Sequence, residues 1–94
     1  MGITLVNAAD PAQRFVLNRL PATIGRQPKA AIRLDDRGVS YFQCRIDADG
    51  GRLTVLDLGS VSGTFVNGIR RALAPLLPGD RLTVGATDFL VGMA

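Results

Sequence analysis

The chain has 94 residues, 47% of them hydrophobic, with eight acidic and eleven basic side chains that give a formal net charge of +3. This length predicts one domain, near the lower size limit at which a single core stabilises a fold, and we expect that domain to span residues 1–94. One cysteine and no histidine exclude an intramolecular disulfide and the common zinc sites, whose ligands come from those two residue types.

The sequence also argues against several classes of partner. No apolar run reaches the ~20 residues of a membrane span, and the first residues lack the basic start and apolar stretch of a secretion signal. The arginines are spread along the chain, whereas nucleic-acid affinity needs a contiguous basic face. We therefore expect a cytoplasmic protein that binds neither membrane nor nucleic acid and carries no cofactor.

Alternation of apolar and polar side chains marks the predicted strands. Cys44, Ile46 and Ala48 fall on one face of a predicted strand, and the charged residues that alternate with them fall on the other. This period of two is typical of strands buried on one side, and the longest stretch free of glycine and proline, residues 39–49, shows no helical period. In chain order, strands are predicted at residues 2–6, 13–18, 21–25, 32–34, 44–48, 51–57, 64–66, 69–72, 81–84 and 87–92.

Turn residues separate these strands. Asp49-Gly50-Gly51, Asn67-Gly68 and Pro78-Gly79-Asp80 carry residue types that favour tight turns. Asn-Gly between apolar runs predicts a two-residue hairpin with positive φ at both positions. Many short strands at close, regular spacing predict an all-β fold, a two-sheet antiparallel β-sandwich of about ten to eleven short strands.

Three long connections are predicted at residues 27–31, 35–42 and 58–63, and loops at the same end of a sandwich can meet around one ligand. Three ordered sequence blocks include or adjoin these loops, namely Gly25-Arg26, Val39 to Ile46 and Asp57 to Gly68, and a fourth block, Gly79-Asp80, comes before the last strands. In their order and spacing the blocks resemble a forkhead-associated (FHA) domain, and the resemblance extends from about residue 3 to 92. The resemblance implies a β-sandwich that reads phosphothreonine through the loops at one end.

The resemblance also implies which residues bind the phosphate. In such domains the arginine after the glycine and the serine of the second block are the ligands, and here these are Arg26 and Ser40. Arg26 offers a forked, charged donor set, and Ser40 offers one hydroxyl donor. Each residue also has a purely structural alternative. Arg26 could be a solvated arginine at a strand end, and Ser40 could be a serine that caps its own turn. Tyr41, Val61 and Ser62 complete the predicted phosphopeptide site.

Those last three positions depart from the family pattern. Tyr41 stands where the family often has arginine, and Val61-Ser62 replaces the usual Thr-Asn. Val61 cannot donate to a phosphate oxygen, and the lost Tyr41 and Val61 contacts would together cost about 2–5 kcal/mol of binding free energy. Gln43 replaces a histidine that stabilises the loop, and its amide can still donate and accept there. We expect a weakened phosphate site on an intact loop framework.

These residues favour a protein-interaction module over an enzyme. No Ser-His, Cys-His or metal constellation can be assembled from the chain, so we expect no catalysis. The expected ligands are phosphothreonine-containing peptides of bacterial signalling partners, such as a Ser/Thr kinase substrate or a secretion or regulatory complex.

The alternative is a degenerate FHA-like scaffold that binds proteins without phosphate or self-associates. Its basis is the Tyr41-Phe42 pair together with Val61, which put apolar side chains where the loops are expected, because exposed apolar clusters often mark interfaces. Against this alternative, we expect Phe42 to pack into the core.

Overall fold

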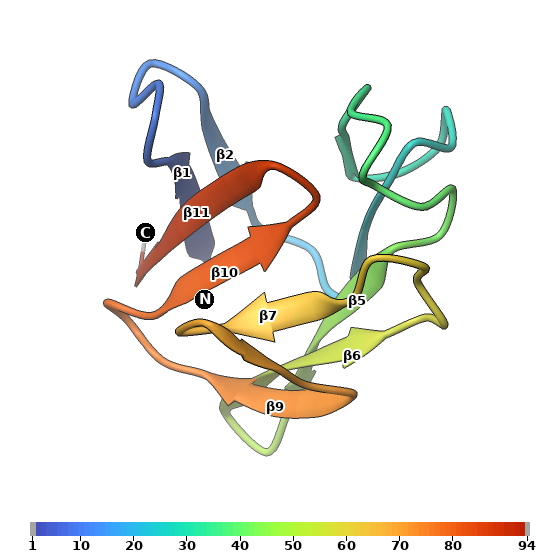
Figure 1. Cartoon of the computed structure of the whole chain (residues 1–94). Helices are drawn as coiled ribbons and strands as arrows, with labels where there is room; N and C mark the ends of the chain where they lie inside the picture. The colour runs from blue at the N-terminus through green and yellow to red at the C-terminus, as the bar shows by residue number, and fades with distance from the viewer. Residues whose placement is uncertain (1, 94) are drawn as a thin grey trace.

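The computed structural model describes residues 2–93, which form eleven β-strands in two sheets packed face to face (Figure 1). One sheet has the order β2-β1-β11-β10-β7-β8 and the other has the order β4-β3-β5-β6-β9. The strands are β1 (Ile3–Asn7), β2 (Arg14–Leu17), β3 (Ala22–Gly25), β4 (Ile32–Arg33), β5 (Cys44–Asp49), β6 (Arg52–Asp57), β7 (Thr64–Val66), β8 (Ile69–Arg70), β9 (Leu73–Leu76), β10 (Arg81–Val84) and β11 (Thr87–Met93). The predicted β-sandwich is confirmed, and β3 and β4 add one parallel pair to sheets that are otherwise antiparallel.

One strand, β9, was not predicted from the sequence. It contains Pro75, which lacks an amide proton and therefore argues against a strand. The strand lies at the edge of its sheet, where Pro75 sits opposite Thr54 and only one side of the backbone has a neighbour. An edge position tolerates the missing donor.

The core lies between the sheets and follows the predicted alternation. In β10, Leu82 and Val84 are buried, and in β5, Cys44 and Ile46 are buried. The expected inward position of Ala48 was wrong, because this residue lies near the β5–β6 turn and is exposed. Burial raises the pKa of the Cys44 thiol to about 12, so this side chain acts as a small apolar core residue.

The hairpin predicted at Asn67-Gly68 is present, with φ of 52° at Asn67 and 82° at Gly68. Asn67 also joins the hairpin to the turn before β10. Its side-chain Oδ1 accepts from the Arg81 backbone N–H at 2.9 Å, and its Nδ2 donates to Asp80 Oδ1 at 3.0 Å. The other oxygen of Asp80 accepts from the Leu77 N–H at 2.8 Å, which closes that turn.

The strand register brings three loops to one end of the sandwich. Ile24 pairs with Cys44, and Cys44 pairs with Asp57. The β3–β4 connection therefore starts beside the place where the β4–β5 loop ends and where the β6–β7 loop begins. We call this group the loop cluster, and its β3–β4 and β4–β5 loops stand at the upper right of Figure 1.

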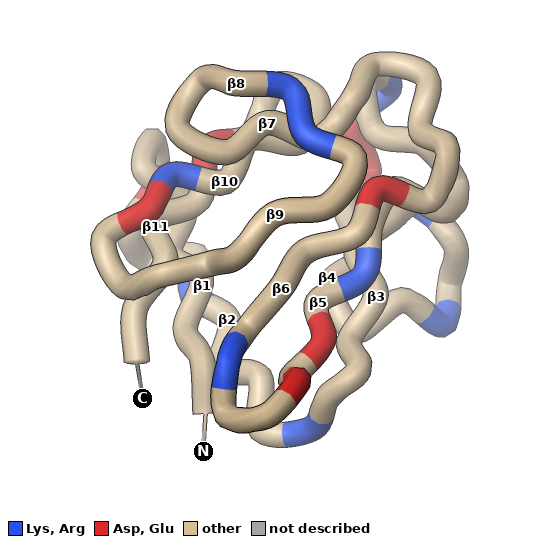
Figure 2. Tube along the Cα trace, turned by 90° about the horizontal axis from the view of Figure 1, so that it is seen from below, with Lys and Arg blue, Asp and Glu red and all other residues tan. Residues whose placement is uncertain are grey.

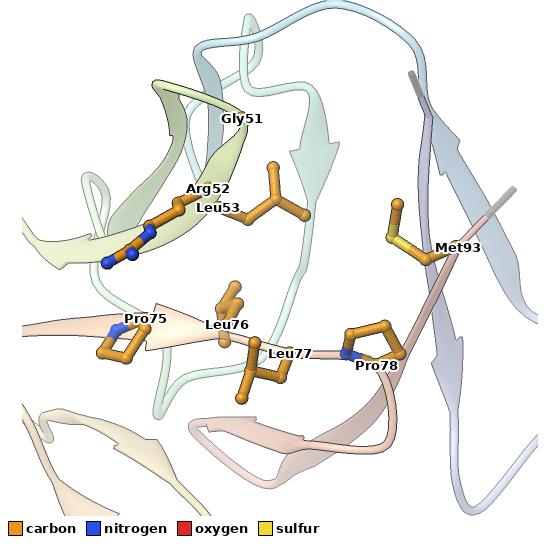
Figure 3. Close-up of a pocket in the computed structure, with 8 residues that line it drawn as sticks. All are labelled: Gly51, Arg52, Leu53, Pro75, Leu76, Leu77, Pro78 and Met93. Atoms are coloured by element: carbon orange, nitrogen blue, oxygen red, sulfur yellow. The ribbon is translucent and has the colours of Figure 1, made fainter.

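The opposite end of the sandwich carries a pocket of about 340 Å³. Arg52 and Leu53 are the first residues of β6, and a six-residue strand spans roughly 20 Å, which separates the pocket from the loop cluster. The Arg52 side chain extends away from Met93 in Figure 3. The pocket is lined mostly by apolar residues: Gly51, Arg52, Leu53, Pro75, Leu76, Leu77, Pro78 and Met93.

Candidate functional site

Arg26 follows the last residue of β3 and lies against the β4–β5 loop. Its Nε donates to the Val39 carbonyl oxygen at 2.7 Å, and its backbone N–H donates to the Ser40 carbonyl at 3.2 Å. The terminal guanidinium nitrogens make no hydrogen bond to any residue between 2 and 93, and the residue is exposed. A guanidinium held by one nitrogen keeps the others free to donate to an oxyanion.

The close approach of β3 to this loop requires glycine at position 25. A Cβ on Gly25 would overlap the carbonyl oxygen of Tyr41. That same oxygen accepts from the Gln27 N–H at 3.2 Å, so the loop backbone cannot move away without breaking a hydrogen bond. Gly25 therefore fixes the position of Arg26 relative to the β4–β5 loop.

Ser40 joins two of the loops. Its Oγ accepts from the Val61 backbone N–H at 3.0 Å, which links the β4–β5 loop to the β6–β7 loop. The alternative that Ser40 caps its own turn was wrong, because this partner lies 21 residues further along the chain. Accepting through a lone pair leaves the hydroxyl hydrogen available to a ligand.

Gln43 forms the buried centre of the loop cluster. Its side chain is fully buried, and its Nε2 donates to the Gly63 carbonyl at 2.9 Å and to Thr64 Oγ1 at 3.1 Å. Its Oε1 accepts from the Ser40 N–H at 2.9 Å. The prediction that the Gln43 amide can still donate and accept to hold the loop is confirmed, since it joins the β4–β5 loop to the start of β7.

Asp57 organises the β6–β7 loop, a role that was missed in the sequence although Asp57 stands two residues before the Gly59-Ser60 pair, and these residue types favour turns. Its carboxylate accepts from the N–H groups of Gly59 at 3.1 Å and Ser60 at 3.0 Å. It also accepts from Ser60 Oγ and, at 2.7 Å, from Thr64 Oγ1. Partial burial is the largest influence and acts to raise the pKa of Asp57, but these hydrogen bonds together hold it below its usual range.

Asp36 fixes the other side of the β4–β5 loop. Its two oxygens accept from the Ala86 N–H at 2.7 Å and from the Gly38 N–H at 2.8 Å, which ties the loop to the β10–β11 turn. The bond from Ala86, followed by the bond from Gly38, lowers the pKa of Asp36. The carboxylate is therefore a structural anchor at neutral pH.

The outer rim of the loop cluster is apolar. Tyr41 is 51% exposed, Phe42 is 55% exposed and Val61 is 87% exposed. The Tyr41 and Phe42 rings contact edge to face, with centroids 5.1 Å apart. The prediction that Phe42 packs into the core was wrong, because Gln43 takes the buried position beside it. Ser62 is also exposed, and its hydroxyl makes no hydrogen bond within the described part of the chain.

A second cation near Arg26 was also missed in the sequence. Arg33, on the outward face of β4, donates from Nε to the Arg26 carbonyl oxygen at 3.1 Å. It also forms an ion pair with Asp35 at 3.7 Å, between two well-exposed side chains. The alternation of buried Ile32 with exposed Arg33 was the available signal. Its contact with Arg26 depends on the parallel β3–β4 pairing, which the sequence does not reveal.

The described residues show no metal or membrane feature. Within residues 2–93 no cluster of three His, Cys, Asp or Glu side chains could hold a metal ion. Over the same range, no helix has the length and apolar character needed to cross a membrane. In the view of Figure 2, basic and acidic residues lie interspersed along the chain.

The fold and the site together define a protein-interaction module. A rigid β-sandwich carries, at one end, an anchored guanidinium and a serine hydroxyl on adjoining loops. A model of the FHA domain matches residues 22–85. The chain belongs to the FHA domain family.

Two curated relatives carry regulatory names. The oxoglutarate dehydrogenase inhibitor of Corynebacterium diphtheriae is 39% identical over 72 residues, which is 77% of this chain and 50% of that protein. The glycogen accumulation regulator GarA of Mycolicibacterium smegmatis is 38% identical over 76 residues, which is 81% of this chain and 48% of that protein. The chain thus spans about half the length of these relatives.

Solved structures share the fold over the whole chain. One, from a structural and functional analysis of phosphothreonine-dependent FHA domain interactions, has a TM-score of 0.91 and 31% identity, and covers 100% of this chain and 98% of that one. EmbR of Mycobacterium tuberculosis, in complex with a low-affinity phosphopeptide, has a TM-score of 0.92 and 26% identity. That match covers 99% of this chain and 24% of EmbR.

Proposed function

We propose that this FHA domain binds phosphothreonine-containing peptides and holds the phosphate between Arg26 and Ser40. The main support is the position of these two side chains on adjoining loops. The Val39 carbonyl fixes Arg26 through Nε, while Ser40 keeps its hydroxyl hydrogen free. Charged, forked donors and a hydroxyl are the groups that suit a phosphate dianion.

The rim residues lower the expected affinity. Tyr41 brings no cation to the phosphate, and the Val61 side chain brings no donor. Loss of one charged and one neutral hydrogen bond costs about 2–5 kcal/mol, which corresponds to binding weaker by tens to thousands-fold. Ser62 is exposed beside Val61 and completes the proposed phosphopeptide site.

We also propose that the domain acts by binding a partner and not by catalysis. The named relatives are an inhibitor of oxoglutarate dehydrogenase and a regulator of glycogen accumulation, and both names describe regulation. A partner phosphorylated by a bacterial Ser/Thr kinase fits an anion site on an interaction module.

The test is a titration with a pool of phosphothreonine peptides and with its unphosphorylated twin, in which fluorescence anisotropy measures binding. Arg26→Ala is expected to weaken binding at least tenfold, because a hydrogen bond to a charged group contributes about 1.5–3 kcal/mol. Arg52→Ala, an exposed arginine at the opposite end, is the matched control and should leave the affinity unchanged. An Arg26→Ala domain that binds as tightly as the parent would overturn the proposal.

A second candidate function is phosphate-independent protein binding through the same loops. The exposure of Tyr41, Phe42 and Val61 favours it, because exposed apolar clusters mark protein interfaces. Equal binding of the phosphorylated and unphosphorylated pools at the loop cluster would support this function over phosphothreonine reading.

A further inference from the structure

We infer that the outer face of the sheet β4-β3-β5-β6-β9 binds a second copy of this chain and forms a two-fold symmetric dimer. Asp49 of each protomer pairs there with Arg52 of its partner. The interface lies on the side of the sandwich, apart from the loop cluster, and the inference goes beyond the proposed function.

The strand register shows which side chains this face carries. Residues paired across neighbouring strands point to the same side of a sheet, and Asp49 of β5 pairs with Arg52 of β6. Both are exposed, whereas Leu53 and Val55, which alternate with the outward residues of β6, are buried in the core. The same face also carries these residues, none of them buried: Arg45, Asp47, Thr54, Leu56, Leu73 and Pro75.

The face holds one carboxylate and one guanidinium that are free to pair with another molecule. Within residues 2–93, neither Asp49 nor Arg52 takes part in an ion pair. The nearest other acid on the face, Asp47, already accepts from Arg45 at 2.8 Å. A patch that carries both signs of charge is complementary to itself, which is what a two-fold interface requires.

A two-fold axis parallel to the strands, between β5 and β6, brings these charges together. Rotation about this axis places β6 of one protomer over β5 of its partner without a shift along the strands. Because Asp49 and Arg52 stand opposite each other in the register, each then meets the opposite charge, twice in the dimer. The rotation keeps the strand direction, so both loop clusters lie at the same end of the dimer.

Apolar surface and a hollow adjoin the two charges. The hollow has a volume of about 380 Å³ and is lined by Asp49, Arg52, Thr54, Leu73, Ala74 and Pro75. Leu73 is 58% exposed, and its burial against a partner would favour association. The same rotation places this hollow over β3 and β5 of the partner, whose side chains can fill it.

The face is the part of this sheet that a second copy can use next to β9. The strands β9, β6 and β5 run side by side across Figure 2, and β9 forms the edge. Pro75 lacks the amide proton that a strand added at this edge would need, so the two sheets do not join edge to edge. The molecule measures 31 × 28 × 27 Å, so one side offers about 800 Å², the area that a standard interface takes from each partner. Since this face is only partly apolar, we expect a weak dimer.

The experiment is sedimentation equilibrium of the whole 94-residue chain from about 10 µM to about 1 mM, the range of a weak interface. We expect the weight-average mass to rise from 10.0 kDa towards twice that value. Arg52→Asp and Asp49→Arg should each weaken association at least about tenfold, because like charges then meet twice across the dimer. Arg14→Asp makes the same charge change on β2 of the other sheet, and this control should associate like the parent.

An equimolar mixture of Arg52→Asp and Asp49→Arg is the most specific test. In the mixed dimer every contact between positions 49 and 52 again joins an acid to a base, so the mixture should regain the association of the parent. A variant that had failed to fold could not regain it. Leu73→Ser tests the same face without a charge change and should weaken association about fivefold, through loss of one partly buried leucine.

The outcomes separate the dimer from phosphothreonine reading. A mass that stays at 10.0 kDa over the whole concentration range would rule out the dimer. Association that survives both single charge variants, or a mixture that stays monomeric, would show that this face is not the interface. Phosphopeptide affinity is measured separately on Arg52→Asp and should equal that of the parent, because Arg52 lies at the end of β6 opposite to the loop cluster.

Discussion

The buried base of the loop cluster is polar and hydrogen-bonded, whereas its exposed rim is apolar. At the base, Gln43, Asp57 and Thr64 form a polar network, and no buried side-chain nitrogen or oxygen in residues 2–93 lacks a hydrogen-bond partner. At the rim, Tyr41 and Val61 are largely open to solvent and place apolar surface around the proposed phosphate site.

We infer from this difference that the base residues mainly hold the loops in shape, whereas Tyr41 and Val61 at the rim mainly affect what the loops bind. A glutamine at the base works because it donates twice and accepts once in a buried position, where each missing partner is costly. A rim side chain contributes little to the fold, so its replacement changes what the loops bind and leaves their shape intact. We therefore expect variants of the base to lower the free energy of unfolding, and variants of the rim to change the affinity for ligand with little effect on stability.

The largest effect is expected for Gln43→Leu at the base. The substitution leaves the Ser40 N–H and the Gly63 carbonyl without their partner, and we expect a loss of about 2–5 kcal/mol in the free energy of unfolding. Chemical denaturation measures this loss. Gln13→Leu is the matched control, at an exposed glutamine whose side chain accepts a hydrogen bond only from the Asn7 side chain, and it should cost less than about 1 kcal/mol. Equal losses in the two variants would contradict the role of the base.

The next largest effect is expected for Asp57→Ala, with a loss of about 2–4 kcal/mol in the free energy of unfolding. It removes the acceptor of Ser60 and Thr64, whose hydroxyls lie at buried positions. The β6–β7 loop should also become more mobile, and amide hydrogen exchange at Gly59 and Ser60 would detect this. Unchanged exchange at both amides would mean that other contacts hold the loop.

The base and the ligand should respond to pH in different ranges. The pKa of Asp57 is lower in the folded state, so its contribution to stability is present above the unfolded pKa of about 3.9 and is lost as pH falls through the folded value. Stability should therefore decline below about pH 4. The ligand responds at higher pH. The second pKa of its phosphate is about 6, and the chain has no histidine that would change charge in the same range. The affinity for phosphopeptide should therefore weaken as pH falls from 7 to 5, while the free energy of unfolding, measured by urea denaturation, stays unchanged.

A smaller effect on stability is expected at the rim. Tyr41→Arg with Val61→Thr restores a cation and a donor, and we expect phosphopeptide affinity to rise at least about tenfold. The free energy of unfolding should change by less than about 0.5 kcal/mol, as for other exposed sites. Isothermal calorimetry and denaturation of the same double variant test both expectations. A large loss of stability would show that the rim supports the loops.

The sequence predicted the features that depend on local pattern. Alternation located most strands, and the Asn67-Gly68 hairpin followed from its residue types. Strand β9 was missed because Pro75 is acceptable only at a sheet edge, and edge positions come from the tertiary arrangement.

The candidate site was predictable to a similar extent. The Arg26 and Ser40 positions followed from ordered motifs, and so did the loop role of Gln43. The exposure of Phe42 was not predictable, because an apolar residue in a loop gives no sign of which neighbour is buried. The hydrogen bonds of Asp57 and the contact of Arg33 with Arg26 depend on loops that meet only in the folded chain.

The most direct test of the account is an NMR titration of the amide signals with a degenerate phosphothreonine peptide pool and with its unphosphorylated twin. We predict that the phosphorylated pool alone shifts the amides of Arg26, Ser40 and Ser62, while amides around the distant pocket, such as Leu76, stay unchanged. No phosphate-dependent shift at high peptide concentration would contradict phosphothreonine reading and would indicate that the apolar rim has replaced it.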